Sequence, residues 1–207
     1  MADDRRMWVF GYGSLLWQPG FEPDERALAR LTGWHRSFCM RSIHHRGTEA
    51  EPGLVLALDA AAGAVCDGLA LAVRPGQEDA VLAYLREREL ISSAYHECEL
   101  DLGLHDGRQV RAVTYVIDPD HVQYCGALPL EEQARIIARA VGGRGPNHEY
   151  LANTVAHLEA LGIGDDDLMW LHRRVAALRR EAAGTGIGNG RAAAYGPPSR
   201  RPGRERE

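Results

Sequence analysis

The chain has 207 residues, of which 45% are hydrophobic and 26% are charged, so its length and composition allow one domain with a full hydrophobic core. Its formal net charge is -5 and all 24 basic residues are arginines, which predicts no nucleic-acid-binding surface and excludes both a P-loop lysine and a Schiff-base lysine. No stretch approaches the roughly 18 apolar residues of a membrane span, and the start MADDRRMW has no signal-peptide pattern, so we expect a cytoplasmic protein that does not bind membranes.

Strand patterns come first along the chain. Six segments are apolar or alternate between apolar and polar residues, and are bounded by Gly, Pro or Asp: 8–12, 34–40, 54–58, 65–73, 95–104 and 110–117. The last two are joined by HDGR at 105–108, where Asp-Gly favours the tight turn of a hairpin.

Helical periodicity appears at 77–90, between the strand patterns, and then at 130–141, 147–161 and 165–181. Strands followed by helices, with one helix inserted, predict an α+β fold: a small mixed or antiparallel, barrel-like sheet with surrounding helices. We expect residues 7–181 to form this domain. The short N-terminus, 1–6, and the Gly-, Pro- and Arg-rich segment 182–207 are expected to be disordered.

The four cysteines, Cys39, Cys66, Cys98 and Cys125, are widely separated and form no CxxC pair. Their spacing fits neither a zinc site nor a thioredoxin-like redox site. Because each lies in or beside an apolar segment, we expect buried free thiols rather than catalytic thiolates.

The first candidate site is GYGSLLW at 11–17, which directly follows an apolar run. Leu16 stands where a dinucleotide fingerprint needs its third glycine, and the segment does not fit the GxSxG pattern of a serine elbow. Gly11 and Gly13 nevertheless let the backbone bend around a ligand and present N–H groups to an anion. From this segment alone, a strand that ends in a tight turn remains the simpler interpretation.

The second candidate is a glutamate in the helix predicted at 77–90. With about 100° between successive residues, Val81, Leu82 and Leu85 form an apolar stripe, and Glu89 falls on it whereas Glu87 falls on the far side. A carboxyl group that faces the core tends to have a raised pKa, which suits proton transfer. The alternative is that Glu89 lies at the helix end, where it reaches water or pairs with an arginine.

Two further segments carry polar side chains. His44, His45 and Arg46 follow a strand pattern and suit an anion, but their spacing does not fit a metal site, and a surface loop is the simpler interpretation. Asn147 and Tyr150 stand at a predicted helix start, where they can face a pocket or, for Asn147, cap the helix.

Five separated motifs are more specific together than any one of them alone. They are MWVFGYGSLLW at 7–17, HRG at 45–47, AYLREREL at 83–90, YCGALPLEE at 124–132 and NHEYL at 147–151. In this order and spacing, from residue 7 to residue 178, the chain resembles the ChaC-type γ-glutamylcyclotransferases. The resemblance implies a lyase that cleaves glutathione into 5-oxoproline and cysteinylglycine, on a compact α+β fold with a barrel-like core.

The resemblance also implies roles for particular residues. It makes Glu89 the catalytic glutamate. Apart from the resemblance, Tyr124, Asn147 and Tyr150 are candidates for holding the leaving portion. The loop that holds the γ-glutamyl group comprises Val9, Phe10, Gly11, Tyr12, Gly13 and Ser14. The family's helix often ends in a GGY-type segment, whereas this chain has ISSAY at 91–95, so the family does not define the pocket beside Tyr95.

The implied chemistry fits these residue types. The substrate's own α-amine attacks its side-chain carbonyl, so proximity supplies much of the acceleration, and no enzyme nucleophile, metal or organic cofactor is needed. Glu89 would take a proton from the amine and return one to the leaving group, while N–H groups near Gly13 and Ser14 bind negative charge.

Three alternatives stay open from the sequence. The first is a cyclotransferase for other γ-glutamyl peptides or amines, and the second is a non-catalytic regulator, linked to cation transport, that binds a γ-glutamyl metabolite. The third is a cysteine hydrolase built on Cys39 with His44 or His45, which thiol alkylation would inactivate. The oligomeric state is open as well.

Overall fold

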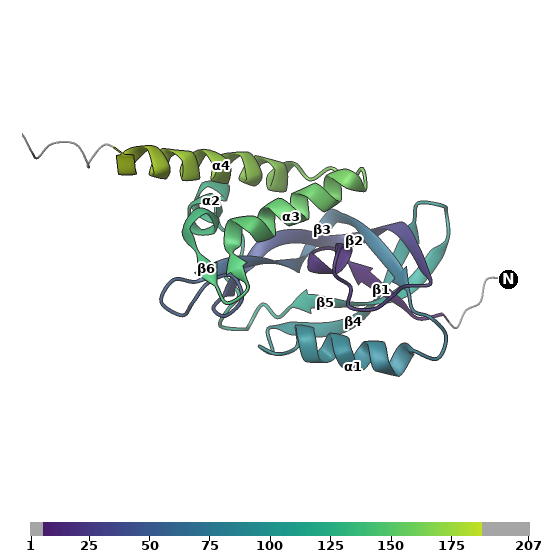
Figure 1. Cartoon of the computed structure of the whole chain (residues 1–207). Helices are drawn as coiled ribbons and strands as arrows, with labels where there is room; N and C mark the ends of the chain where they lie inside the picture. Colours follow the sequence, from purple (N-terminus) through teal and green to yellow (C-terminus); the bar gives the residue numbers. More distant parts are fainter. Residues whose placement is uncertain (1–5, 188–207) are drawn as a thin grey trace, which may run out of the picture.

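The computed structural model describes residues 6–187, in which five strands close into a barrel (Figure 1). The strands are β1 (Trp8–Gly11), β2 (Glu25–Ser42), β3 (Gly53–Ala72), β4 (Tyr95–Leu104) and β5 (Gln109–Ile117), in the order β1-β3-β2-β4-β5. Parallel pairing of β1 with β5 closes the barrel, and antiparallel pairs form most of the remainder. The predicted fold class, a small mixed barrel-like sheet with surrounding helices, is confirmed.

The longest element is the antiparallel ribbon of β2 and β3, paired from Glu25↔Ala72 to Ser42↔Gly53. The predicted boundaries were wrong here, because the two segments 54–58 and 65–73 form one strand and β2 begins well before residue 34. The linking segment DAAAGA at 59–64 is partly exposed and has weak strand propensity, but Asp59 and Ala60 pair with β2, and the register shifts over the rest of the segment. Cross-strand pairing thus overrides local preference.

The hairpin of β4 and β5 agrees with its prediction. Tyr95 pairs with Ile117 at one end and Gly103 with Gln109 at the other. The turn between them contains Gly107 at φ +93°, the left-handed conformation that Asp-Gly turns require.

The helices lie on two sides of the barrel (Figure 1). α1 (Glu78–Glu89) covers one side, and α2 (Leu130–Arg139), α3 (Asn147–Ala160) and α4 (Asp166–Ile187) pack together on the other. A two-stranded hairpin of β6 (Val141–Gly142) and β7 (Gly145–Pro146) joins α2 to α3. Within the described residues, no helix has the length and apolar character to cross a membrane.

Both ends of the domain differ from the predicted boundaries. α4 continues to Ile187, past the predicted helix end at residue 181 and into the segment expected to be disordered. Arg6, also assigned to a disordered end, forms ion pairs of 2.9 Å with Asp24 and with Glu25. The rest of the expected disorder falls on 1–5 and 188–207, outside the described residues.

The core fills the barrel and the space between the barrel and the helices. Its largest fully buried side chains include Phe10, Phe38, Tyr115, Leu85 and Leu151. All four cysteines fall in the described part of the chain, are free thiols and are buried or half-buried, as predicted.

Candidate active site

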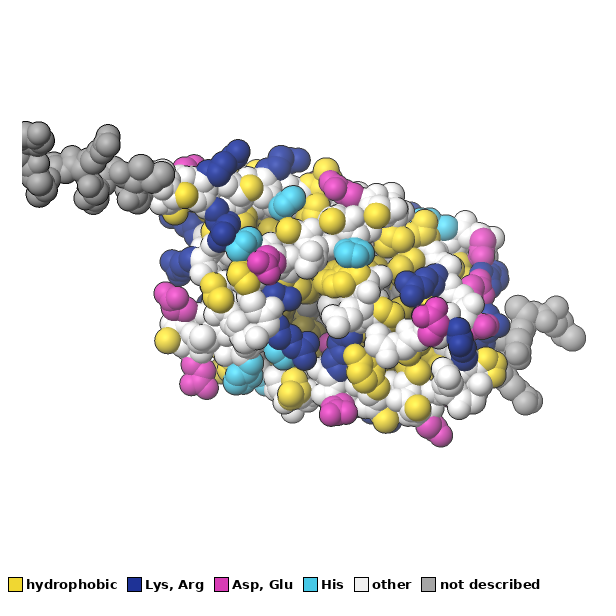
Figure 2. Space-filling model, in the orientation of Figure 1, with side chains coloured by type: hydrophobic (Ala, Val, Ile, Leu, Met, Phe, Trp, Pro, Cys, Tyr) yellow, Lys and Arg dark blue, Asp and Glu magenta, His cyan; other side chains and the backbone are white. Residues whose placement is uncertain are grey.

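A pocket is hollowed into the face that Figure 2 shows, with arginine side chains beside the hollow. Its cavity has a volume of about 170 Å³. The walls come from distant parts of the chain: the loop after β1, the loop after β2, the end of α1, the start of β4, the β6–β7 hairpin and α3. The fold therefore assembles this site from segments that are far apart in the sequence.

Glu89 is the last residue of α1 and lines the pocket with a side chain that is 19% exposed. Leu85 on the same helix is fully buried and Glu87 is exposed, so the predicted orientation of the helix is confirmed. Burial raises the pKa of Glu89 above its usual value, and the positive charges of Arg88 and Arg144 oppose that shift. A carboxyl group with a raised pKa is better matched to proton transfer near neutral pH.

Arg88 connects this helix end to the loop after β1. Its Nε lies 3.0 Å from Oε1 of Glu89, so pairing with an arginine, the alternative considered from the sequence, also occurs. The N–H does not meet that oxygen in hydrogen-bond geometry, and Oε1 is buried without a hydrogen-bond partner among residues 6–187. Arg88 donates instead to Ser14 Oγ at 2.7 Å and to the Gln18 carbonyl at 2.5 Å.

The loop after β1 makes one 3-10 turn, η1 (Ser14–Leu16), and places Tyr12, Gly13 and Ser14 in the pocket wall. The backbone N–H groups of Gly13 and Ser14 find no acceptor in the described part of the chain. A Cβ at position 13 would lie 3.3 Å from the Tyr150 hydroxyl, so glycine allows this close approach. The loop can therefore offer two unpaired donors to an anionic group.

Three of the tyrosines in the wall, Tyr12, Tyr95 and Tyr150, are uncharged polar groups beside Glu89. Tyr12 donates to the Tyr115 carbonyl at 2.9 Å, and Tyr95 donates to the Leu56 carbonyl at 3.1 Å. Burial raises the pKa of all three, to about 12 for Tyr150, so they stay protonated. The Tyr150 hydroxyl donates to no residue within 6–187 and is available to a ligand.

His44, His45 and Arg46 all line the pocket, so they are more than part of a surface loop. The Arg46 guanidinium lies 5.5 Å from the centre of the Tyr150 ring and donates to the Arg144 carbonyl at 2.7 Å. Burial, followed by the positive charge of Arg144, lowers the pKa of His45. Among the described residues, no three His, Cys, Asp or Glu side chains gather as they would around a metal ion.

Three residues assigned to the binding loop lie outside the pocket. Val9, Phe10 and Gly11 belong to β1 and are buried in the barrel. Because these residues are buried in the barrel, they support the loop and do not line the cavity.

Tyr124 and Asn147 also lie away from the cavity. The Tyr124 hydroxyl donates to Asp59 at 2.7 Å. The Asn147 side chain is fully buried and forms two 2.7 Å hydrogen bonds with the backbone of Leu54, one as donor and one as acceptor. It joins the start of α3 to β3, which is neither of the two roles expected from the sequence.

A sequence model of the ChaC-like protein family matches residues 7–178. The chain belongs to the ChaC-like family. It is 38% identical over 166 residues to the glutathione-specific γ-glutamylcyclotransferase of Escherichia coli, covering 80% of this chain and 71% of that protein. It is 31% identical over 163 residues to the human glutathione-specific γ-glutamylcyclotransferase 1, covering 78% of this chain and 73% of the human protein.

A solved structure agrees with this assignment. The yeast γ-glutamylcyclotransferase specific to glutathione superposes with a TM-score of 0.77 at 25% identity, covering 85% of this chain and 98% of the yeast chain. The resemblance found from the five motifs is thus confirmed, and the chain belongs to a family of γ-glutamylcyclotransferase enzymes.

The fold brings together residues from four of the five ChaC motifs at the pocket. The loop after β1, the HRG segment, the end of α1 and Tyr150 of NHEYL meet there, whereas Tyr124 of the remaining motif lies elsewhere. Arg88 was not predicted as a site residue because the helical projection places it away from Glu89, although its long side chain reaches both that carboxylate and the loop. Arg144, in a glycine-rich turn, had no sequence signal.

Proposed function

We propose that this protein is a γ-glutamylcyclotransferase that converts glutathione into 5-oxoproline and cysteinylglycine. The observation that carries the proposal is the carboxyl group of Glu89, which lines the pocket together with the glycine loop and has a buried oxygen that accepts no hydrogen bond from the described residues. Membership of the ChaC-like family and the names of its relatives support glutathione as the substrate.

Substrate binding follows from the polarity of the wall. The α-ammonium group of the γ-glutamyl portion fits beside Glu89, the one acidic side chain among the residues that line the described pocket. The α-carboxylate and the γ-carbonyl oxygen need hydrogen-bond donors. The N–H groups of Gly13 and Ser14 have no backbone acceptor among the described residues, and the Tyr150 hydroxyl, which lines the pocket, can donate its proton to a ligand. The positively charged group thus meets a carboxylate, and the two oxygen-bearing groups meet hydrogen-bond donors.

The reaction then needs only a proton transfer and an intramolecular attack. Glu89 removes a proton from the ammonium group, and the freed amine attacks the γ-carbonyl carbon to close a five-membered ring. The negative charge that develops on the carbonyl oxygen is stabilised by donors already in place. As the old C–N bond breaks, the protonated Glu89 returns its proton to the departing cysteinyl nitrogen. The lactam nitrogen then loses the second proton of the original ammonium group, and the released amine of cysteinylglycine takes up that proton.

A cysteine hydrolase is a poorer fit to this site. Cys39 is fully buried, and burial raises the pKa of its thiol to about 12. The thiolate needed for nucleophilic attack is therefore scarce near neutral pH.

We place the reaction in the cytoplasm, as the sequence predicts. The four cysteines are unpaired, which is typical of proteins from reducing compartments.

Comparison of Glu89→Gln with Glu87→Gln tests the proposed function. Purified proteins are incubated with glutathione, and 5-oxoproline and cysteinylglycine are measured by mass spectrometry. Wild type should release both products, and Glu89→Gln should lower kcat by roughly 10²–10⁴-fold, because the proton acceptor is lost. Calorimetry should still detect binding of glutathione to that variant.

Glu87→Gln is the matched control, since Glu87 lies on the same helix but is exposed. It should keep wild-type turnover. Equal losses in the two variants would refute the role of Glu89, and the absence of both products with wild type would refute the proposed activity on glutathione.

A further inference from the structure

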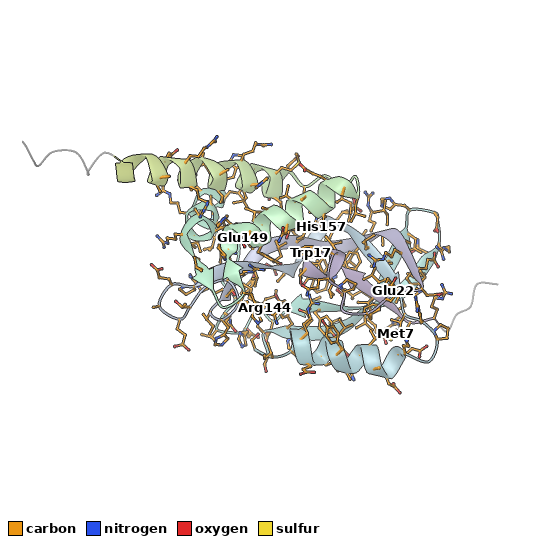
Figure 3. All side chains as sticks on the ribbon, in the orientation of Figure 1. Met7, Trp17, Glu22, Arg144, Glu149 and His157 are labelled. Carbon is orange, nitrogen blue, oxygen red and sulfur yellow. The ribbon has the colours of Figure 1, made fainter. Side chains whose placement is uncertain are left out.

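Arg144 lies in the short turn between β6 and β7, at the edge of the pocket (Figure 3). Its backbone is fixed on both sides of the residue. Its N–H donates to the His45 carbonyl at 2.9 Å, and its carbonyl accepts the 2.7 Å hydrogen bond from Arg46. The neighbouring Gly143 N–H donates to the His44 carbonyl at 2.8 Å.

The hairpin that carries Arg144 is packed too closely to move easily. A Cβ at Gly142 would lie 2.4 Å from the Gly47 nitrogen and 2.6 Å from the Arg46 nitrogen. Just after the hairpin, Asn147 is joined to β3 by its two hydrogen bonds to Leu54. The turn therefore holds the Arg144 backbone at a defined position beside the cavity.

The side chain of Arg144 is exposed, lines the pocket and has a guanidinium without any hydrogen bond or ion pair within residues 6–187. The other two arginines of the wall are already engaged, Arg46 with backbone carbonyls and Arg88 with Ser14, Gln18 and Glu89. Of the three, Arg144 has every guanidinium donor free for a ligand, whereas Arg46 already uses its Nη1 and Arg88 uses both of its Nη atoms.

The charges at the described pocket favour a ligand with more than one carboxylate. Arg46, Arg88 and Arg144 face a single acidic side chain, Glu89. Glutathione carries two carboxylates, one on the γ-glutamyl group and one on the terminal glycine. An extended cysteinylglycine spans about 7 Å, which carries the glycine carboxylate from the buried wall toward the exposed edge where Arg144 lies.

We propose that Arg144 binds the glycine carboxylate of the departing cysteinylglycine and so favours γ-glutamyl peptides with a free C-terminal carboxylate over γ-glutamyl amines. This inference rests on the proposed function and adds a specificity-determining residue to it. The guanidinium of arginine is suited to the task because two of its N–H groups match the two oxygens of a carboxylate.

Binding and turnover are measured with two ligands, glutathione and its glycine ethyl ester, in which the glycine carboxylate is blocked. Calorimetry uses the Glu89→Gln background to prevent turnover, and compares Arg144→Ala with the control Arg139→Ala, an exposed arginine outside the pocket. Arg144→Ala should weaken glutathione binding by roughly five- to tenfold, the scale of a solvent-accessible charged hydrogen bond. The same substitution should leave the affinity for the ester unchanged.

In the active enzyme, Arg144→Ala should raise KM for glutathione by a similar factor with little change in kcat, and Arg139→Ala should change neither ligand's binding. The assignment would be overturned if Arg144→Ala weakened the binding of glutathione and of the ester equally, or did not weaken the binding of glutathione. It would also be overturned if glutathione did not bind to the wild-type pocket. If wild type shows no turnover yet Arg144 still discriminates the two ligands in binding, the proposed function fails and the carboxylate site stands.

Discussion

The side chain of Glu89 is half-buried, and one of its carboxyl oxygens is buried without a hydrogen-bond partner among the described residues. The helical projection correctly placed this residue on the inward face of α1. It could not show that the side chain meets a cavity, because the cavity is formed by the loop after β1, α3 and the β6–β7 hairpin. A group held this way favours proton transfer at a cost in stability.

The raised pKa of Glu89 predicts a pH-dependent stability difference. In the folded state the carboxyl group keeps its proton above the ordinary value of 4.5, so the folded protein binds more protons than the unfolded one there, and stability falls as pH rises through that window. Glu89→Gln removes this effect. It should therefore be more stable than wild type at about pH 7 and similar to it at about pH 4, as measured by urea unfolding.

The same upward shift of the Glu89 pKa places the acid limb of the pH–rate profile above 4.5, because the deprotonated carboxylate is the active form.

Glu87→Gln serves as the control for the stability measurement and should show no pH-dependent gain in stability over wild type. Glu89→Gln that is less stable than wild type at about pH 7 would contradict the burial argument.

At the scale of elements, the pocket depends on how α3, the loop after β1 and the β6–β7 hairpin are fixed to the barrel. Trp17 and His157, which lie next to each other in Figure 3, stack with ring centres 5.0 Å apart and join the loop to α3. Asn147 joins the start of α3 to β3. The sequence indicated a polar residue at this helix start, but its partner, Leu54, is distant in the chain and only the fold brings them together.

Asn147→Ala tests this connection. The substitution leaves the buried N–H and carbonyl of Leu54 without partners, so the free energy of unfolding should fall by about 2–4 kcal/mol. Urea unfolding measures the change. Asn153→Ala, on the exposed side of the same helix, should change it by less than about 0.5 kcal/mol. A loss below about 1 kcal/mol for Asn147→Ala would refute this role.

At the scale of the whole molecule, a buried arginine connects the barrel, the pocket loop and the last helix. Arg36 is 5% exposed, donates to the carbonyls of Tyr12 and Asp67 at 3.0 Å, and pairs with Asp165 at 2.9 Å. Asp165 also accepts the Leu168 N–H at the start of α4. α4 is thus part of the folded unit, although it lines no part of the pocket.

Truncation distinguishes the catalytic unit from the end of the chain. A chain that ends at Ile187 should keep wild-type kcat/KM and Tm, because every residue that lines the described pocket lies between Tyr12 and Tyr150. A chain that ends before Asp165 should fail to fold, since it loses α4 and leaves the Arg36 charge buried without its partner. Steady-state kinetics and thermal unfolding measure both. Loss of activity in the chain that ends at Ile187 would show that residues 188–207 contribute to the reaction.

The sequence by itself determined the class of fold, the β4–β5 hairpin, the starts of α2 and α3, the inward face of α1 and the family, because these depend on local periodicity, turn chemistry and motif order. The tertiary structure decided the rest. The β2–β3 ribbon continues across DAAAGA because the segments on both sides of it pair with β2, and the pocket acquires Arg88 and Arg144 through contacts between residues far apart in sequence. Local patterns carry no information about such contacts, which exist only once the barrel has closed.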